Sequence, residues 1–170
     1  TSSPGRDAHP AYLPDGKTIL FQSPRDHSEA GQVDLWIMDA DGANQKRLLA
    51  APGFNGVPNP SPDGKRFTFQ RGTVEGESYH WELYLVNADG GDLRQLTSNA
   101  WSSQVPTWSS DGKRIVFYAN PDGRAQLFAV AGIGVGHHDL DHHRQRDGQE
   151  RAHRSEQPTP DHDRQHHDQR

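Results

Sequence analysis

The sequence predicts an all-β fold: a partial β-propeller of about three four-stranded antiparallel blades, the third incomplete, followed by a disordered C-terminal tail. Three observations support this prediction. A turn motif occurs three times at a spacing of 48 residues, segments with alternating apolar side chains follow each copy, and all 14 aromatic residues lie at or before Phe128. Such alternation is typical of β-strands, and four-stranded sheets repeated along a chain are typical of propellers.

The turn motif combines Asp, Gly and Lys. Its copies are Leu13–Lys17, Ser61–Lys65 and Ser109–Lys113. Asp can accept a hydrogen bond from the backbone two residues on, and Gly adopts the positive φ that closes such a turn. A catalytic acid would occur once, whereas Asp15, Asp63 and Asp111 recur with the motif. We therefore interpret them as structural turn residues.

The segments around each turn predict four strands per unit. The innermost strand precedes the turn, at 11–12, 57–58 and 105–108. The second strand follows the turn and has apolar pairs at alternate positions, which are Ile19 and Phe21, Phe67 and Phe69, and Ile115 and Phe117. The third, at 35–38, 83–86 and 127–130, is apolar on both faces, as expected of a strand between two other layers. The fourth is amphipathic and follows an Asp-Gly turn, at 45–49 and 93–97.

We place the blades at about 8–52, 53–100 and 101–132. The third is shorter because Pro121-Asp122-Gly123 replaces a longer linker, and its sequence has no fourth strand after Val130. Each blade packs its faces on its neighbours, so three blades leave two faces uncovered. We expect the chain to belong to a larger propeller, to associate with another copy through its open faces, or to be marginally folded alone.

Residues 133–170 form a low-complexity segment that contains eight of the 11 His. It has too few apolar side chains to offset the entropy of ordering, so we expect it to be disordered. His138 and His142, with Asp139 and Asp141, have side chains that bind Zn²⁺, Ni²⁺ or Cu²⁺, and weak metal binding is one function to consider. A shifted reading frame, in which Thr codons of a GC-rich gene are read as His and Asp codons, is one hypothesis for the segment's origin.

Two stretches carry a resemblance to a known family. Pro106–Phe117 reads Pro-x-Trp-Ser-x-Asp-Gly-Lys-Arg-Ile-x-Phe and resembles the TolB-like propeller repeat, and Leu83–Thr97 is similar to the second half of that repeat. The resemblance covers roughly residues 8–132. Family members include the periplasmic TolB protein of the Tol-Pal envelope system and propeller domains attached to serine peptidases. The resemblance therefore implies an extracytoplasmic bacterial protein with more blades than this chain contains.

Composition excludes several classes of function. The net charge of -5 gives no reason to expect nucleic-acid binding, and the absence of Cys excludes disulfides and Cys-based zinc sites. The apolar runs are too short to insert into a membrane. The only Met is Met38, so we expect the chain to be a fragment of a longer protein.

Few residues are candidates for chemistry. Ser61 and His80 could be imagined in a nucleophilic triad, but no Gly-x-Ser-x-Gly elbow is present. Trp81, Trp101 and Trp108 could line a ligand surface, although packing between blades is the better interpretation, least firmly for Trp101 in a loop. We therefore assign no catalytic, cofactor-binding or metal-binding residue and expect no cofactor.

The sequence favours a non-catalytic module whose loops or central funnel contact a protein partner. One alternative is the propeller segment of a peptidase-type enzyme whose catalytic domain lies outside these residues. The other is weak metal binding by the His-rich tail.

Overall fold

The computed structural model describes residues 1, 3, 5–75, 78–98 and 100–132, and every regular element among them is a β-strand. The first sheet contains β1 (Ala8–Tyr12), β2 (Thr18–Ser23), β3 (Asp34–Asp39) and β4 (Lys46–Leu49). The second contains β5 (Phe54–Pro60), β6 (Arg66–Glu75), β7 (Ser78–Asn87) and β8 (Arg94–Gln95). The third contains β9 (Ser103–Trp108), β10 (Arg114–Ala119) and β11 (Gln126–Ala131).

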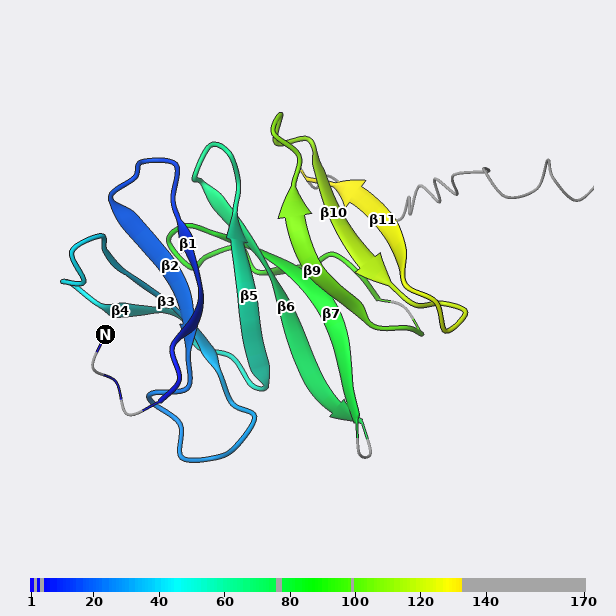
Figure 1. Ribbon diagram of the computed structural model, residues 1–170, viewed down its shortest axis with the longest axis horizontal. Helices are drawn as coiled ribbons and strands as arrows, with labels where there is room; N and C mark the ends of the chain where they lie inside the picture. The colour runs from blue at the N-terminus through cyan, green and yellow to red at the C-terminus, as the bar shows by residue number, and fades with distance from the viewer. Residues whose placement is uncertain (2, 4, 76–77, 99, 133–170) are drawn as a thin grey trace, which may run out of the picture.

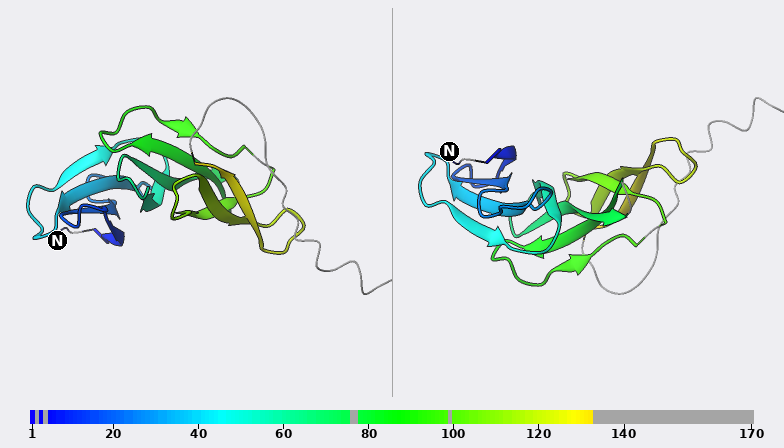
Figure 2. Two further views of the ribbon diagram at one scale, coloured as in Figure 1. Left: turned by 90° about the horizontal axis from the view of Figure 1, so that it is seen from above. Right: turned by 90° about the horizontal axis from the view of Figure 1, so that it is seen from below.

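Each sheet is an antiparallel meander in which strands that follow one another in the sequence are paired. The three sheets stand side by side in chain order (Figure 1), with the N-terminus beside the first sheet and the third sheet at the other end (Figure 2). The strands that precede the Asp-Gly turns contact one another in turn, β1 with β5 and β5 with β9. This arrangement confirms the predicted partial propeller. The predicted tail and its candidate metal ligands lie outside the described residues.

The core consists of two layers, one between each pair of neighbouring blades. Alternate side chains of the second blade point in opposite directions, because successive residues of a strand face opposite sides of the sheet. The first layer contains Leu20, Leu35, Leu49, Phe67, Phe69 and Val86. The second contains Leu83, Phe117 and Ala119, with partly buried Leu96, Trp101, Phe128 and Val130 packed against them. The third strand of the second blade therefore serves both layers, as its apolar sequence predicts.

The predicted turns have the expected geometry. Gly16, Gly64 and Gly112 adopt φ values of 65°, 68° and 69°. In each turn the backbone N–H two residues after Asp donates to the Asp carboxylate, at 2.8 Å for Lys17, 3.1 Å for Lys65 and 3.0 Å for Lys113. The carboxylates thus fix the tight connection into β2, β6 and β10.

Each innermost strand contains an irregularity that the sequence did not indicate. His9, Val57 and Val105 adopt φ values of 51°, 52° and 51°, and the pairing register with the next strand shifts around each of them. These positions are 48 residues apart. A positive φ is unusual for Val, so the surrounding blades must compensate for its cost.

Strand β8 is shorter than the segment 93–97 that we expected, because side chains replace part of the backbone ladder. The N–H of Leu83 donates to the Thr97 hydroxyl oxygen at 2.9 Å, and the Gln95 side chain donates to the Thr97 carbonyl at 2.7 Å. The outer segment still follows β7, but only Arg94 and Gln95 pair with it regularly. Within the described ranges, no helix is long and apolar enough to cross a membrane.

Candidate functional site

The carboxylates of Asp15, Asp63 and Asp111 are hydrogen-bonded within their own turns. Hydrogen bonds lower the pKa of all three below the usual Asp value, the largest contribution coming from the Lys17 N–H for Asp15, the Ser61 hydroxyl for Asp63 and the Ser109 hydroxyl for Asp111. A lowered pKa keeps each carboxylate ionised and accepting from the backbone. None of this prepares the side chains to donate a proton at neutral pH.

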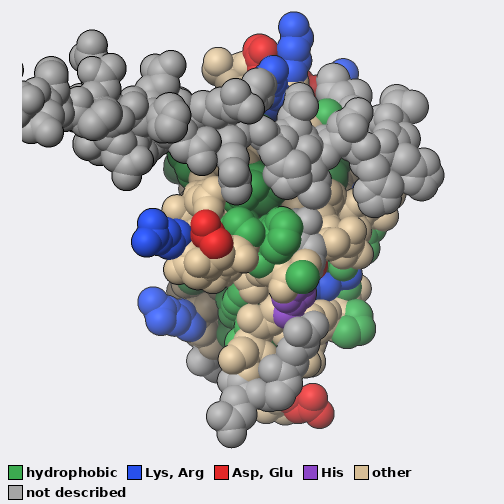
Figure 3. Space-filling model, turned by 90° about the vertical axis from the view of Figure 1, so that its right-hand side faces the viewer, with side chains coloured by type: hydrophobic (Ala, Val, Ile, Leu, Met, Phe, Trp, Pro, Cys, Tyr) green, Lys and Arg blue, Asp and Glu red, His purple; other side chains and the backbone are tan. Residues whose placement is uncertain are grey.

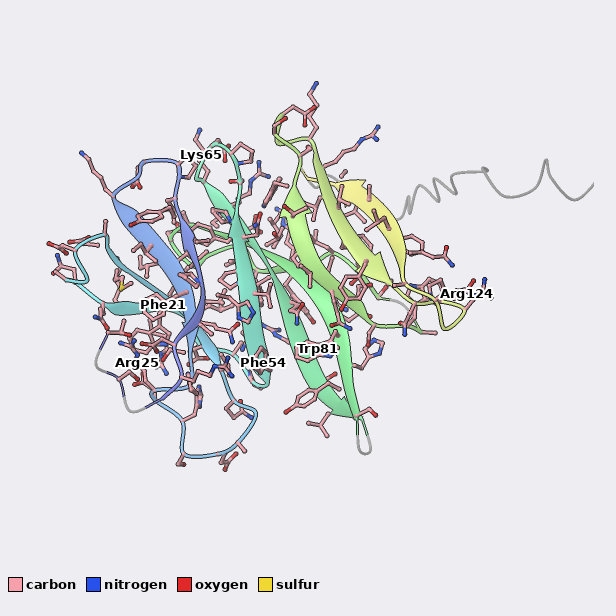
Figure 4. All side chains as sticks on the ribbon, in the orientation of Figure 1. Phe21, Arg25, Phe54, Lys65, Trp81 and Arg124 are labelled. Carbon is pink, nitrogen blue, oxygen red and sulfur yellow. The ribbon has the colours of Figure 1, made fainter. Side chains whose placement is uncertain are left out.

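Ser61 and His80 lie toward opposite ends of the second blade. The Ser61 hydroxyl donates to Asp63 at 2.6 Å and accepts from the Arg66 N–H at 3.1 Å, so it belongs to the turn. His80 pairs with Thr73, seven residues along β6 from Arg66, a distance of roughly 23 Å at the usual rise per residue. Figure 4 shows this separation, with Lys65 beside the turn and Trp81 in the lower half of the blade. The structure therefore does not bring this pair together.

Trp101 and Trp108 lie between blades, in agreement with the interpretation made from the sequence. The Trp108 indole N–H donates to the carbonyl of Asn59 in the preceding blade at 3.3 Å, and the Arg66 guanidinium carbon lies 5.9 Å from the centroid of the Trp108 ring. Trp101 packs against the second core layer. These two rings contribute to packing between blades.

Trp81 belongs to a separate group of side chains, which we call the aromatic surface: Phe54, Val74, Tyr79 and Trp81. The Trp81 ring makes an edge contact with Phe54 at a centroid distance of 5.3 Å and stacks on Tyr79 at 5.2 Å. Phe54 lies on β5 and Trp81 on β7, with β6 between them, and Figure 4 shows both residues in the lower half of the second blade. Tyr79 and Val74 are 40% and 69% exposed, so the surface is open to solvent.

The aromatic surface exists because the second blade has the longest hairpin. Strands β6 and β7 contain 10 residues each, whereas β2, β3, β10 and β11 contain 6. The additional pairs include Gly72 with Trp81 and Val74 with Tyr79. In Figure 1 these strands continue to the lower end of the molecule. The alternation of Val74, Tyr79 and Trp81 was the sequence signal for this extension, and sequence reasoning missed it.

Two glycines leave the space that the Trp81 and Tyr79 side chains occupy. A Cβ added at Gly72 would come within 2.7 Å of the Trp81 ring, so the missing side chain provides the space in which the ring lies. A Cβ added at Gly31, which has φ of 82°, would come within 2.5 Å of the Tyr79 hydroxyl oxygen. Gly31 precedes β3 of the first blade, so the hairpin of the second blade rests against its neighbour.

A buried acidic residue lies on the third strand of each of the first two blades, at the start of β3 and in the middle of β7. Asp34 and Glu82 are 48 residues apart, and each pairs with a His: Asp34 with His27 at 2.9 Å and Glu82 with His80 at 3.0 Å. The Thr97 hydroxyl also donates to Glu82. The Thr97 contact joins the middle of β7 to the outer segment of the second blade. The 48-residue spacing of Asp34 and Glu82 was the sequence signal for this equivalence, and it was missed.

A depression of about 600 Å³ lies at the turn end of the second blade, and its lining includes Arg66, Asn87, Asp92 and Arg94. Asp92 and Arg94 form an ion pair at 2.8 Å, so each of these charges already has a partner within the chain. Within the part of the chain that the structure describes, no group of three or more His, Cys, Asp or Glu side chains is placed to hold a metal ion.

Comparison with known proteins identifies the family. The model of the TolB beta propeller domain matches residues 28–149, which is more than half of the chain. The chain belongs to the TolB β-propeller domain family. No curated protein matches it.

Solved structures show the same fold. TolB from Acinetobacter baumannii is 23% identical with a TM-score of 0.63, over 77% of this chain and 31% of that one. A putative TolB from Agrobacterium tumefaciens is 23% identical with a TM-score of 0.62, over 80% of this chain and 50% of that one. This TolB propeller segment thus spans a third to a half of those proteins.

More distant neighbours of the TolB propeller segment include enzymes. A puromycin-hydrolyzing peptidase from Mycobacterium tuberculosis is 17% identical with a TM-score of 0.59, over 75% of this chain and 20% of that one. The propeller domain of the trilobed protease from Pyrococcus furiosus is 13% identical with a TM-score of 0.56, over 75% of this chain and 39% of that one. At these identities the likeness concerns the fold alone.

Proposed function

We propose that this segment is a non-catalytic part of a larger extracytoplasmic propeller protein and that it binds a protein partner through the aromatic surface. The observation that carries the proposal is the exposed stack of Tyr79 on Trp81 at the end of the longest hairpin. Tyr and Trp are the side chains that most often dominate binding energy at protein interfaces.

The aromatic surface combines exposure with rigidity. Ten residue pairs connect β6 and β7 in unbroken register, so the hairpin holds Val74 and Tyr79 in fixed positions. The contact of Tyr79 with the loop at Gly31 supports the hairpin from the side. Binding then requires little ordering of the backbone, which lowers the entropic cost of association. Binding residues are commonly held in position by a rigid scaffold in this way.

The absence of a catalytic role is supported by how the candidate groups are used. The repeated Asp residues close turns, Ser61 is hydrogen-bonded within a turn, and His80 pairs with Glu82 within β7. An extracytoplasmic location is supported by the likeness to TolB proteins. Cell fractionation with an antibody to this chain would test the location.

The partner can be found by photocrosslinking. We expect a chain with p-benzoylphenylalanine in place of Tyr79 to form a discrete crosslinked product with one protein in the source cells. The matched control carries the same amino acid in place of Lys113, an exposed turn residue of the third blade. Equal labelling from both positions would contradict the proposal.

Binding of the identified partner should depend on the exposed side chains. The double variant Val74→Ser/Tyr79→Ser is expected to bind at least about tenfold more weakly in titration calorimetry, because it removes an exposed apolar contact worth about 1.4 kcal/mol or more. Unchanged affinity would exclude the aromatic surface as the binding site.

A second candidate is a propeller segment that accompanies a peptidase domain, which the distant likeness to two peptidases favours. The crosslinking experiment separates the two candidates. A crosslink from Tyr79 to a hydrolase domain of the same polypeptide would support the second, and a crosslink to a separate protein would support the first.

A further inference from the structure

The contact between neighbouring blades follows the same pattern twice. The side-chain oxygen of Gln22 in the first blade accepts the N–H of Val57 in the second at 2.9 Å. The side-chain oxygen of Gln70 in the second blade accepts the N–H of Val105 in the third at 3.0 Å. Both Gln residues are 6% exposed. We call this contact the Gln latch: a Gln side-chain oxygen of one blade accepts the N–H of the positive-φ residue of the next blade.

The first blade carries the N–H side of this contact on its open face. His9 adopts φ of 51° at the position equivalent to Val57 and Val105. Tyr12 occupies the position equivalent to Trp108, which packs over Asn59 of the preceding blade. No blade precedes the first among the described residues, and Tyr12 is 61% exposed. The face is therefore shaped like the two that are covered by a neighbour.

The third blade carries the acceptor side of this contact on its own open face. Tyr118 occupies the position of Gln22 and Gln70, and its hydroxyl donates to the Gln104 side chain at 3.0 Å. A hydroxyl that donates once still has lone pairs with which to accept. Leu127, which pairs with Tyr118 on the same side of the sheet, is 73% exposed. Figure 3 looks at the molecule from the side of the third sheet and shows hydrophobic side chains gathered in the middle of this face.

We propose that the 170-residue chain by itself associates head to tail with a second copy, with the third blade of each against the first blade of the other, in the place that further blades take in a larger propeller. The two open faces differ, so the contact joins unlike surfaces, and such contacts close into a ring when the rotation permits. Each copy supplies three blades. Two copies complete a ring with two equivalent contacts, in which Tyr118 accepts the N–H of His9 and Leu127 and Tyr12 become buried.

The area of the contact fits a reversible dimer. Three strands about 4.8 Å apart and six residues long present a face of roughly 300 Å². Two contacts remove four such faces from water, or roughly 1,200 Å², which is the lower limit for specific interfaces. We therefore expect association in the micromolar range rather than a permanent dimer.

Sedimentation equilibrium of the full 170-residue chain tests the association. Between about 1 and 200 µM, the range expected for a small interface, the average mass should rise from that of one chain toward twice that value. Leu127→Asp and Tyr12→Asp should each keep the mass of one chain throughout. The control is Leu93→Asp, which changes a 40% exposed Leu of the second blade that lies on neither open face, and it should associate like the wild type. A wild-type chain that stays monomeric at the highest concentration would overturn the proposal.

Crosslinking tests the orientation without depending on the folding of charged variants. The chain has no Cys, so His9→Cys and Tyr118→Cys each introduce a single thiol. A short bis-maleimide should join the two variants to each other in a mixture and should join neither efficiently to itself. Self-crosslinking of either variant at the rate of the mixture would show that like faces meet and would overturn the head-to-tail arrangement. Loss of partner binding through the aromatic surface would leave both results unchanged, so the dimer and the proposed function can fail separately.

Discussion

At the scale of single residues, two equivalent turn glycines have different surroundings. Gly42 and Gly90 have φ values of 90° and 88° at the same point of the first and second blades. A Cβ at Gly90 would lie 2.6 Å from the carbonyl oxygen of Leu48, whereas a Cβ at Gly42 would meet no atom within 4 Å. The turn of the second blade therefore rests on the outer strand of the first.

This difference predicts unequal costs for the same substitution. Gly42→Ala should lower the free energy of unfolding by about 1 kcal/mol, since Ala disfavours positive φ. Gly90→Ala should lower it by about 3 kcal/mol, because the methyl group must also displace the Leu48 carbonyl. Urea unfolding of the two variants measures both values. Equal costs would show that the turn does not contact β4 in solution.

The turn carboxylates predict how stability depends on pH. Hydrogen bonds hold the pKa of Asp15, Asp63 and Asp111 below the usual value in the folded chain. Their contribution is complete above the unfolded pKa of about 4 and is lost as the pH falls through the lower folded pKa. The wild type should therefore lose stability as the pH is lowered below about 4.

Asn at all three positions removes this dependence while keeping the hydrogen-bond acceptor. The triple variant Asp15→Asn/Asp63→Asn/Asp111→Asn should show a smaller decrease in its urea midpoint from pH 5 to pH 2, values that bracket the titration of about 4. Parallel curves for the two proteins would mean that other carboxylates determine the acid sensitivity.

The conformation of the turns could be predicted from the sequence, whereas the positive-φ residues of the innermost strands could not, and the reason is physical. An Asp-Gly pair contains both the acceptor and the residue that tolerates positive φ, so its conformation can be read locally. Val57 and Val105 adopt positive φ against their own preference, and the compensating acceptors come from Gln22 and Gln70, which are 35 residues away. Their conformation depends on the neighbouring blade, which local patterns do not describe.

At the scale of elements, the Gln latch should contribute measurably to the contact between blades. Gln22→Met and Gln70→Met each leave a partly buried N–H without its acceptor and should lower the free energy of unfolding by about 1 to 2 kcal/mol. Gln45→Met, at an exposed position, is the matched control and should change it by about 0.5 kcal/mol or less. The measurement is urea unfolding. Equal effects at the three positions would remove the Gln latch as a stabilising contact.

Element lengths were harder to infer than element types. The four-strand pattern of each unit follows from alternation and turn residues, and the sheets confirm it for the first two blades. The length of β6 and β7 depends on Gly72 making room for Trp81, and the short β8 depends on Thr97 bonding through its side chain. Both are tertiary effects, and they determine where the aromatic surface lies.

At the scale of the whole molecule, the 48-residue period was enough to infer a propeller with uncovered ends. Periodicity says that each blade needs neighbours, but it does not say which surface binds a partner. The aromatic surface arises where the second blade departs from the common pattern, as its 10-residue strands show. Function in this fold is thus sought in the differences between blades, while the similarities describe the scaffold.

The positive-φ residues have one more consequence, which concerns unwanted assembly. Strands β1, β5 and β9 each end their sheet, and an uninterrupted end strand offers a row of free backbone groups to any other extended chain. A kink at His9, Val57 and Val105 interrupts that row in each of the three described blades. The sides of the sheets at β1, β5 and β9 are thereby protected against fibril-like growth, even though no further sheet of the described residues pairs with these strands.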